Sequence, residues 1–210
     1  MNRLPGIVRQ HIAALRGLLL FTVICGIAYP LLMFGIGQGV FHNQANGSLV
    51  SVNGKVVGSS LLCQEFVDAK GNPLPQYFQP RPSEAVNPAS KTDYGCDPLF
   101  SGASNLGPNN QVLVQDIKAR QQQIAQFDHV PVSSIPADAV TASGSGLDPD
   151  ISPQYADLQV NRVAQARHLS PAVVRALVTK YTQGRNLGFL GEPRVDVLNL
   201  NVALDKLSAH

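Results

Sequence analysis

The sequence from Gly17 to Gly39, GLLLFTVICGIAYPLLMFGIGQG, decides how the chain is organised, because it contains no charged side chain. The hydrocarbon core of a membrane is about 30 Å thick, and about twenty apolar residues in a helix cross it. The stretch is long enough, so residues 17–39 are predicted to form a single transmembrane helix.

The charges that precede this stretch predict its orientation. They are Arg3, Arg9 and Arg16, with no acidic residue among them. Basic flanks are retained on the cytoplasmic side of a membrane. Residues 1–16 are therefore predicted to be a cytoplasmic tail, and residues 42–210 a periplasmic or extracytoplasmic domain.

A cleaved secretory signal is the alternative explanation of the apolar stretch. Such a signal has a short apolar region that is followed by small residues at the cleavage site. Gly26-Ile27-Ala28 comes nearest to a cleavage site, but apolar residues continue from Leu31 to Ile36. An uncleaved anchor is therefore favoured.

The rest of the chain has the composition of one folded domain. Its length of about 170 residues is enough for one hydrophobic core. Apart from the three arginines before the anchor, the basic residues nearly balance the 14 acidic ones. No cluster of lysine or arginine provides the positive surface that a phosphate backbone requires, so no nucleic-acid partner is expected.

Cysteine usage leaves one question open. Cys25 lies within the predicted anchor, whereas Cys63 and Cys96 lie on the exported side, where disulfides persist. These two could form a disulfide or remain separate thiols, because the sequence does not give the distance between their Cα atoms. No Cys-x-x-Cys is present, which excludes zinc-ribbon and thioredoxin chemistry.

The exported region is predicted to begin with a hairpin and to continue as irregular chain. Asn53-Gly54 favours a type I′ turn between strands over residues 48–52 and 55–59. Residues 70–108 are rich in proline, glycine, asparagine and serine. Long irregular segments of this kind are often functional.

Helices are predicted in the second half of the chain. Residues 110–127 carry apolar side chains on one helical face, namely Leu113, Ile117, Ile124 and Phe127. Ser152-Pro153 and Ser170-Pro171 each provide an N-cap serine and a proline at the first helical position, so two further helices should run to about residues 167 and 182. Their predicted inward positions are Leu158, Val163, Ala166, Val173, Val174, Leu177 and Val178.

A short strand and a last helix should complete the domain. Val195 and Val197 alternate with polar neighbours, which is typical of a strand, and residues 198–207 have the composition of a helix. The predicted fold class is α+β, with a single amino-terminal transmembrane helix followed by one exported mixed α/β domain.

Catalytic motifs are missing from the sequence. There is no phosphate-binding Gly-x-x-x-x-Gly-Lys-Ser/Thr, and Asp205-Lys206-Leu207 is not the aspartyl-phosphate motif of P-type ATPases. In Gly102-Ala103-Ser104-Asn105-Leu106, leucine replaces the second glycine of a hydrolase elbow. No histidine pair has the spacing of metal ligands on one helix. The sequence therefore predicts no catalytic residues and no metal site.

Short strings along the chain resemble one known family. They are Tyr29-Pro30-Leu31, Gln44-Ala45-Asn46-Gly47-Ser48-Leu49, Tyr77-Phe78, Arg81-Pro82-Ser83, Ser104-Asn105-Leu106, and the segments 140–148, 151–154, 162–167 and 197–205. In order and position they resemble KdpC, the small subunit of the bacterial Kdp potassium pump. Cys63 and Cys96 are not hallmarks of that family, and residues 70–102 are longer than its compact form.

The resemblance implies a non-catalytic accessory subunit of a high-affinity, ATP-driven potassium importer in the bacterial inner membrane. It implies three partners: a channel-like subunit that binds potassium, a P-type ATPase subunit, and a very small fourth subunit. It also implies that the chain stabilises assembly and acts as a catalytic chaperone that raises the ATP affinity of the ATPase subunit.

The predicted topology conflicts with direct contact between the large domain and ATP. ATP is cytoplasmic, and only about sixteen residues of this chain should be on that side. Gln154 lies in a string that matches the family and is the residue to test for a nucleotide role, although a place in the first turn of a helix also explains it. We therefore expect no cofactor on this chain itself, with ATP acting through the ATPase subunit.

The anchor carries the residues expected to contact other subunits. Gly35 and Gly39 are four residues apart, so a neighbouring transmembrane helix could approach closely, although a glycine-rich exit from the membrane explains them equally well. Pro30 removes a helix hydrogen bond and follows Tyr29 in a family string. The residues predicted to contact other subunits are Tyr29, Pro30, Gly35 and Gly39. The exported domain is expected to cap the potassium entrance.

Two alternatives from other classes are open at this point. A membrane-anchored hydrolase requires a nucleophile and a base, and loss of activity on changing Ser104 alone would favour it. A free-standing envelope binding module requires no partners, and purification as a monomer after mild solubilisation would favour it.

Overall fold

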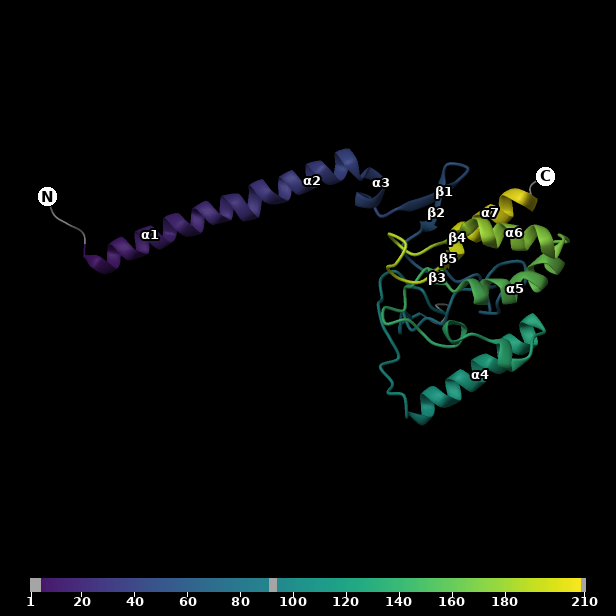
Figure 1. Cartoon of the computed structure of the whole chain (residues 1–210). Coiled ribbons are helices and arrows are strands. Elements are labelled where there is room, and N and C mark those ends of the chain that lie inside the picture. The colour runs from purple at the N-terminus through teal and green to yellow at the C-terminus, as the bar shows by residue number, and fades with distance from the viewer. Residues whose placement is uncertain (1–4, 91–93, 209–210) are drawn as a thin grey trace. The chain divides into compact units, whose positions relative to one another are not determined.

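The computed structural model describes residues 5–90 and 94–208 (Figure 1). The chain separates into two compact units, one that ends at Ser48 and one that begins at Leu49. We call the second unit the carboxy-terminal domain. It begins seven residues after the boundary expected from the sequence, because residues 42–45 form the short helix α3 (His42–Ala45) and belong to the first unit.

The first unit contains the predicted membrane-spanning helix. Gly6–Val40 is helical throughout and is, within the described part of the chain, the one helix long and apolar enough to cross a membrane. It consists of α1 (Gly6–Phe21), a π-helical segment η1 (Thr22–Ala28) and α2 (Tyr29–Val40). The helix begins well before the apolar stretch, so the described part of the predicted tail is helical.

The predicted hairpin is confirmed. β1 (Leu49–Val52) pairs antiparallel with β2 (Lys55–Ser59). At the turn, Asn53 and Gly54 have φ angles of 51° and 77°, the positive values that a type I′ turn requires of both central residues.

Three helices of the carboxy-terminal domain begin at the residue that the sequence predicts or one residue after it. They are α4 (Gln111–Asp128), α5 (Pro153–Ala166) and α6 (Pro171–Tyr181). Asn110, Ser152 and Ser170 cap them by accepting hydrogen bonds from backbone amides in the first turn. Short 3₁₀ turns, η2 (Val132–Ser134) and η3 (Ala137–Ala139), lie between α4 and α5.

A small antiparallel sheet brings the ends of these helices together. Its strands have the order β3 (Asp150–Ile151), β5 (Arg194–Asp196), β4 (Thr182–Gln183). The sequence does not predict β3 and β4, because two residues are too few to show an alternating pattern.

The last helix, α7 (Val197–Ser208), starts directly after β5. The Asn199 amide donates a hydrogen bond of 2.7 Å to Asp196 Oδ1, so the carboxylate holds the first turn of this helix. Burial raises the pKa of Asp196 to about 6. The terminal helix is confirmed, but the strand ends at Asp196, so placing Val197 in the strand is wrong.

The core of the carboxy-terminal domain lies where α5, α6 and α7 pack on the small sheet. Its fully buried side chains include Phe78, Val160, Val163, Val174, Val195, Leu200 and Leu204. Of the predicted inward positions, Val163, Val174, Leu177 and Val178 are buried. Ala166 and Val173 are exposed, which corrects the prediction for those two. Both lie at the edge of the helical stripe, where periodicity alone does not fix which side chains are covered.

Candidate functional site

The irregular segment after the hairpin is held in place by side-chain amides from two helices. The Asn201 amide exchanges two hydrogen bonds of 2.9 Å with the backbone of Phe78. The Gln159 amide does the same for Gln79, at 2.7 and 3.2 Å. Because backbone polar groups in a protein interior need partners, these buried amides take the place of a neighbouring strand.

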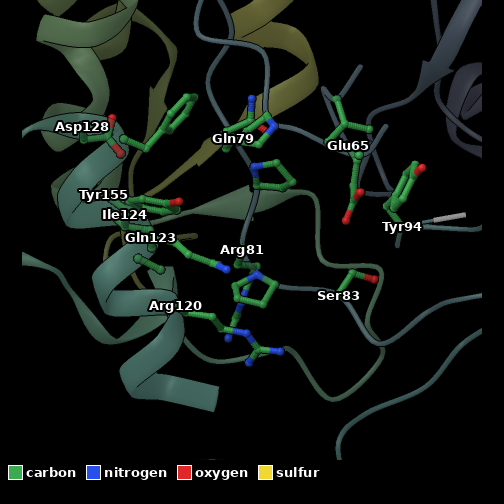
Figure 2. Close-up of a pocket in the computed structure, with 17 residues that line it drawn as sticks. Glu65, Gln79, Arg81, Ser83, Tyr94, Arg120, Gln123, Ile124, Asp128 and Tyr155 are labelled. Carbon is green, nitrogen blue, oxygen red and sulfur yellow. The ribbon is translucent and has the colours of Figure 1, made fainter. Parts of the chain in front are cut away.

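A cavity of about 410 Å³ lies between this segment and α4 (Figure 2). From α4 the cavity is lined by Arg120, Gln123 and Ile124. From the irregular segment it is lined by Gln79, Arg81 and Ser83. Glu65 and Tyr94 line the cavity on the right of the view, and Tyr155 and Asp128 line it on the left. Polar and apolar side chains together line this cavity, which makes it a place to look for ligand chemistry.

The two arginines of the cavity are already engaged. Arg81 forms an ion pair of 2.7 Å with Asp148 and donates twice more to the Thr141 carbonyl. Arg120 forms an ion pair of 3.0 Å with Glu84 and donates to the Val140 carbonyl. Both guanidinium groups thus tie separate parts of the chain together, and neither is poised as a free anion-binding group.

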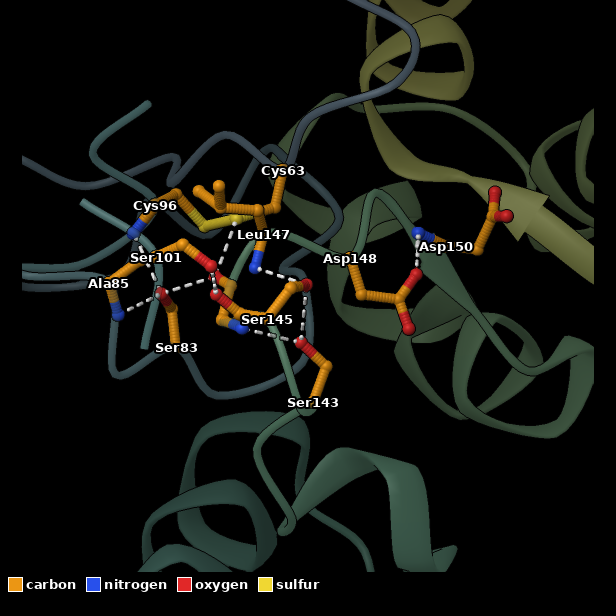
Figure 3. The surroundings of a disulfide bond; sticks show 11 residues. Cys63, Ser83, Ala85, Cys96, Ser101, Ser143, Ser145, Leu147, Asp148 and Asp150 are labelled. Carbon is orange, nitrogen blue, oxygen red and sulfur yellow. Dashed lines mark hydrogen bonds between the residues drawn. A yellow bond between two sulfur atoms is a disulfide. The ribbon is translucent and has the colours of Figure 1, made fainter. Parts of the chain in front are cut away.

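A disulfide closes the segment that forms one wall of the cavity. Cys63 and Cys96 are bonded, with their Cα atoms 5.4 Å apart (Figure 3). Between them in sequence lie Glu65, Arg81 and Ser83, all of which line the cavity. The disulfide therefore closes a loop that contains half of the candidate site.

Ser83 is the centre of the network beside this disulfide. Its hydroxyl donates to the Gly146 carbonyl at 2.6 Å and accepts from the amides of Ala85 and Cys96, at 3.1 and 2.8 Å (Figure 3). A hydroxyl with its donor and both acceptor positions occupied is not a nucleophile. Ser83 positions the chain and performs no chemistry.

Gly146 allows three segments to meet in this network. It has a φ of 71°, and a Cβ atom there would lie 2.5 Å from the Gly102 carbonyl oxygen and 2.8 Å from the Ala85 amide nitrogen. Only glycine meets both requirements. Gly146 is therefore the packed position of the glycine- and serine-rich string 143–146, whereas Gly144 and Ser145 are exposed.

A buried ion pair lies behind the cavity. Arg162 Nε donates to Asp128 Oδ1 at 2.7 Å, and both side chains are almost completely buried. Arg162 also donates to the carbonyls of Pro75 and Tyr77 and to Gln159. Burial raises the pKa of Asp128 above its usual value, although the guanidinium beside it lowers it.

The described residues offer no metal chemistry. Among residues 5–90 and 94–208, no group of three His, Cys, Asp or Glu side chains could hold a metal ion. The paired arginines and the engaged Ser83 show that these polar groups are used for internal connections.

The predicted docking residues all lie on the second half of the long helix. Tyr29 is 60% exposed, and a Cβ atom at Gly35 or Gly39 would meet no other atom within 4 Å. Pro30 lies in the first turn of α2, directly after the π-helical segment. Among the described residues, no other side chain covers Gly35 or Gly39, and the role of the four residues in contacting another subunit stays a prediction.

Gln154 belongs to the carboxy-terminal domain and lies outside the lining of the cavity. It is exposed in the first turn of α5, between the N-cap Ser152 and the buried Tyr155. The predicted nucleotide role of Gln154 is not tested by this placement.

Sequence reasoning missed the ion pairs and the most exposed apolar loop of the domain. The ion pairs join residues 34 to 67 positions apart and leave no local signal. The loop is Asn186–Leu190. Its glycine-rich surroundings indicate a turn, and the leucines and phenylalanine at positions where turns usually carry polar residues are the signal that could have revealed it.

Comparison with known proteins gives a match along almost the whole chain. The family model described as KdpC, the c chain of a K⁺-transporting ATPase, matches residues 11–206. A Streptomyces avermitilis protein named potassium-transporting ATPase KdpC subunit is 46% identical over 220 residues, which cover 99% of this chain and 98% of that protein. Proteins of the same name from Mycobacterium tuberculosis and Methylococcus capsulatus are 47% and 48% identical, and cover 95% and 92% of this chain and 99% and 96% of their own lengths.

Proposed function

The chain belongs to the KdpC family of potassium-transporting ATPase subunits, and we propose that it stabilises the assembled pump and raises the ATP affinity of the ATPase subunit without binding ATP itself. It is an accessory subunit of the pump, so the hydrolase and the free-standing binding module are not needed to explain it. The match over residues 11–206 is the observation that carries the proposal.

In this proposal the anchor and the carboxy-terminal domain contribute separately. The anchor docks against the channel-like subunit and the ATPase subunit, with the very small fourth subunit nearby. The carboxy-terminal domain covers the entrance through which potassium, the transported ion, reaches the channel-like subunit.

The orientation proposed for the anchor implies an indirect effect on ATP. Arg9 and Arg16 lie in the amino-terminal part of the helix, and no charged residue follows until Lys55. Basic residues favour the cytoplasmic side, so the carboxy-terminal domain is proposed to face the periplasm, across the bacterial inner membrane from cytoplasmic ATP. The exposed Gln154 would then meet no nucleotide in an intact cell.

Labelling from outside the cell tests this orientation. In a Cys25→Ala background, an Ala172→Cys chain should react with a membrane-impermeant maleimide in intact cells, because Ala172 is exposed on α6. A Gln10→Cys chain, with its cysteine on the predicted cytoplasmic side, should react only after the cells are broken. The opposite pattern would place the domain in the cytoplasm and revive direct contact with ATP.

Co-purification tests the predicted subunit contacts of the anchor. The full chain, extracted in mild detergent with the rest of the pump, should be recovered with two larger membrane subunits and potassium-stimulated ATPase activity. Replacing Gly35 and Gly39 by leucine places bulk on the open face and should reduce recovery at least ten-fold, because close helix approach depends on small residues.

Gly37→Leu is the matched control for this experiment. Gly37 lies about 200° around the helix from Gly35, and a Cβ atom there would make only ordinary van der Waals contact with Ala45, at 3.6 Å. This variant should be recovered like the wild type. Equal recovery of all three chains would show that the glycines are only a flexible exit from the membrane.

A further inference from the structure

The loop between β4 and β5 carries the most prominent apolar surface of the carboxy-terminal domain. Leu187 is 82% exposed, Phe189 70% and Leu190 49%. Elsewhere in the described part of the domain, exposed apolar side chains such as Leu99 are more scattered. No other four consecutive residues there contain three of them. Figure 1 shows this stretch, in yellow-green, looping out from β4 and β5. We call residues Asn186–Leu190 the docking loop.

The structure holds the docking loop in one shape without help from a partner. Asn186 and Leu190 exchange backbone hydrogen bonds of 2.8 and 2.9 Å, and the Gly188 amide donates to the Arg185 carbonyl at 3.1 Å. An ion pair of 2.8 Å between Arg185 and Glu192 closes the base. Apolar side chains presented on such a preformed loop lose little further freedom on binding.

The backbone of the loop tip supports the same conclusion. Leu187 has a φ of 53° and is followed by Gly188 at 81°. A leucine side chain disfavours this left-handed conformation, and strained residues of this kind gather at binding sites. Leu187 at the tip is directed into solvent, so its side chain contributes little apolar burial to the fold of this chain.

The charges around the loop decide between a protein and a lipid surface as its occupant. Apolar loops that bind membranes are accompanied by lysine or arginine, because membrane surfaces are anionic. Here the nearest cation, Arg185, is paired with Glu192. The recess at the base of the loop contains the carboxylates of Asp138, Asp148 and Asp150. Its two arginines are also paired, Arg81 with Asp148 and Arg194 with Asp150. With its cations paired and carboxylates nearby, the loop is better suited to bind a protein surface than an anionic membrane.

We propose that the docking loop inserts Leu187 and Phe189 into an apolar pocket on another subunit of the potassium-transporting ATPase. This inference rests on the proposed function, since it names the surface by which the carboxy-terminal domain joins the pump. It assigns the domain a contact separate from the glycine face of the anchor.

Site-specific photocrosslinking in the complete pump tests the inference. Phe189 is replaced by benzoylphenylalanine, which keeps an aromatic ring at that position, and the full chain is produced with the other subunits. Irradiation should link this chain to one larger subunit at least five-fold more strongly than a chain with the same group at Leu99. Leu99 is the matched control, because it is 86% exposed and stands alone. Equal yields at both positions, or adducts with lipid only, would overturn the inference.

A pair of substitutions gives a second readout. Leu187→Ser with Phe189→Ser should leave the circular dichroism of the chain unchanged, because both side chains are exposed. It should raise at least ten-fold the dissociation rate of this chain from the detergent-extracted pump, whereas Leu99→Ser should not.

The outcomes separate this inference from the proposed function. If the wild-type chain co-purifies with an active pump but position 189 does not crosslink to a subunit, the docking loop is wrong and the function stands. If the wild-type chain is recovered without larger subunits, both are wrong.

Discussion

Arg162→Met is expected to lower the free energy of unfolding of the carboxy-terminal domain by about 3–5 kcal/mol, the usual result of removing one partner from a buried ion pair. Asp128 would keep a carboxylate that is 2% exposed without the group that neutralises it. The carbonyls of Pro75 and Tyr77 would also lose their donor. Urea denaturation of the full chain in mild detergent, followed by circular dichroism, measures the change.

The effect of this substitution should depend on pH. Without Arg162, the pKa of Asp128 in the folded state rises further above its unfolded value. A carboxyl with a raised folded-state pKa contributes stability that is fully present below about pH 4 and is lost as pH rises through that pKa. The deficit of the variant should therefore be smaller near pH 4 than near pH 8, and a deficit independent of pH would contradict this account.

A second ion pair in the same domain provides the matched control. Arg175 Nε and Asp157 Oδ1 are also 2.7 Å apart, but their side chains are 50% and 56% exposed. Arg175→Met should cost less than about 1 kcal/mol, because solvent screens exposed pairs. Similar losses for the two arginines would mean that burial does not determine the effect.

Removing the disulfide with Cys63→Ser and Cys96→Ser is expected to destabilise the carboxy-terminal domain by about 3–4 kcal/mol. The bond joins residues 33 positions apart, so it strongly restricts the unfolded chain. It also closes the loop that carries Arg81 and Ser83. The urea midpoint of the double variant, compared with that of the wild type, measures the loss.

Two comparisons isolate the contribution of the disulfide. Wild-type chain reduced in urea and then refolded under reducing conditions should match the double variant. Cys25→Ser should behave like the oxidised wild type, because Cys25 is a free cysteine in the anchor. A wild-type midpoint that is insensitive to reductant would show that the bond contributes nothing to stability.

The sequence predicts the elements that depend on neighbouring residues. Asn53-Gly54 determines its own turn, and Ser152-Pro153 and Ser170-Pro171 determine the starts of their helices, because caps and turns act over a few positions. The apolar run before Val40 likewise predicts the long helix, since composition alone distinguishes it.

The parts that sequence cannot predict depend on residues far apart in the chain. The path of the segment around Phe78 and Gln79 is fixed by Asn201 and Gln159, which follow it by 123 and 80 positions. The partner of Arg162 is likewise distant, and no periodic pattern encodes it. Exposure of Ala166 and Val173 depends on how neighbouring helices cover α5 and α6, which one helix viewed alone does not reveal.

The π-helical segment Thr22–Ala28 changes which way the two halves of the anchor face. A π-helix has more residues in each turn than an α-helix, so it breaks the regular rotation from α1 to α2. Side chains seven positions apart across this segment no longer form one continuous stripe. The two halves of the anchor therefore present their side chains in different directions, as two short helices joined end to end would.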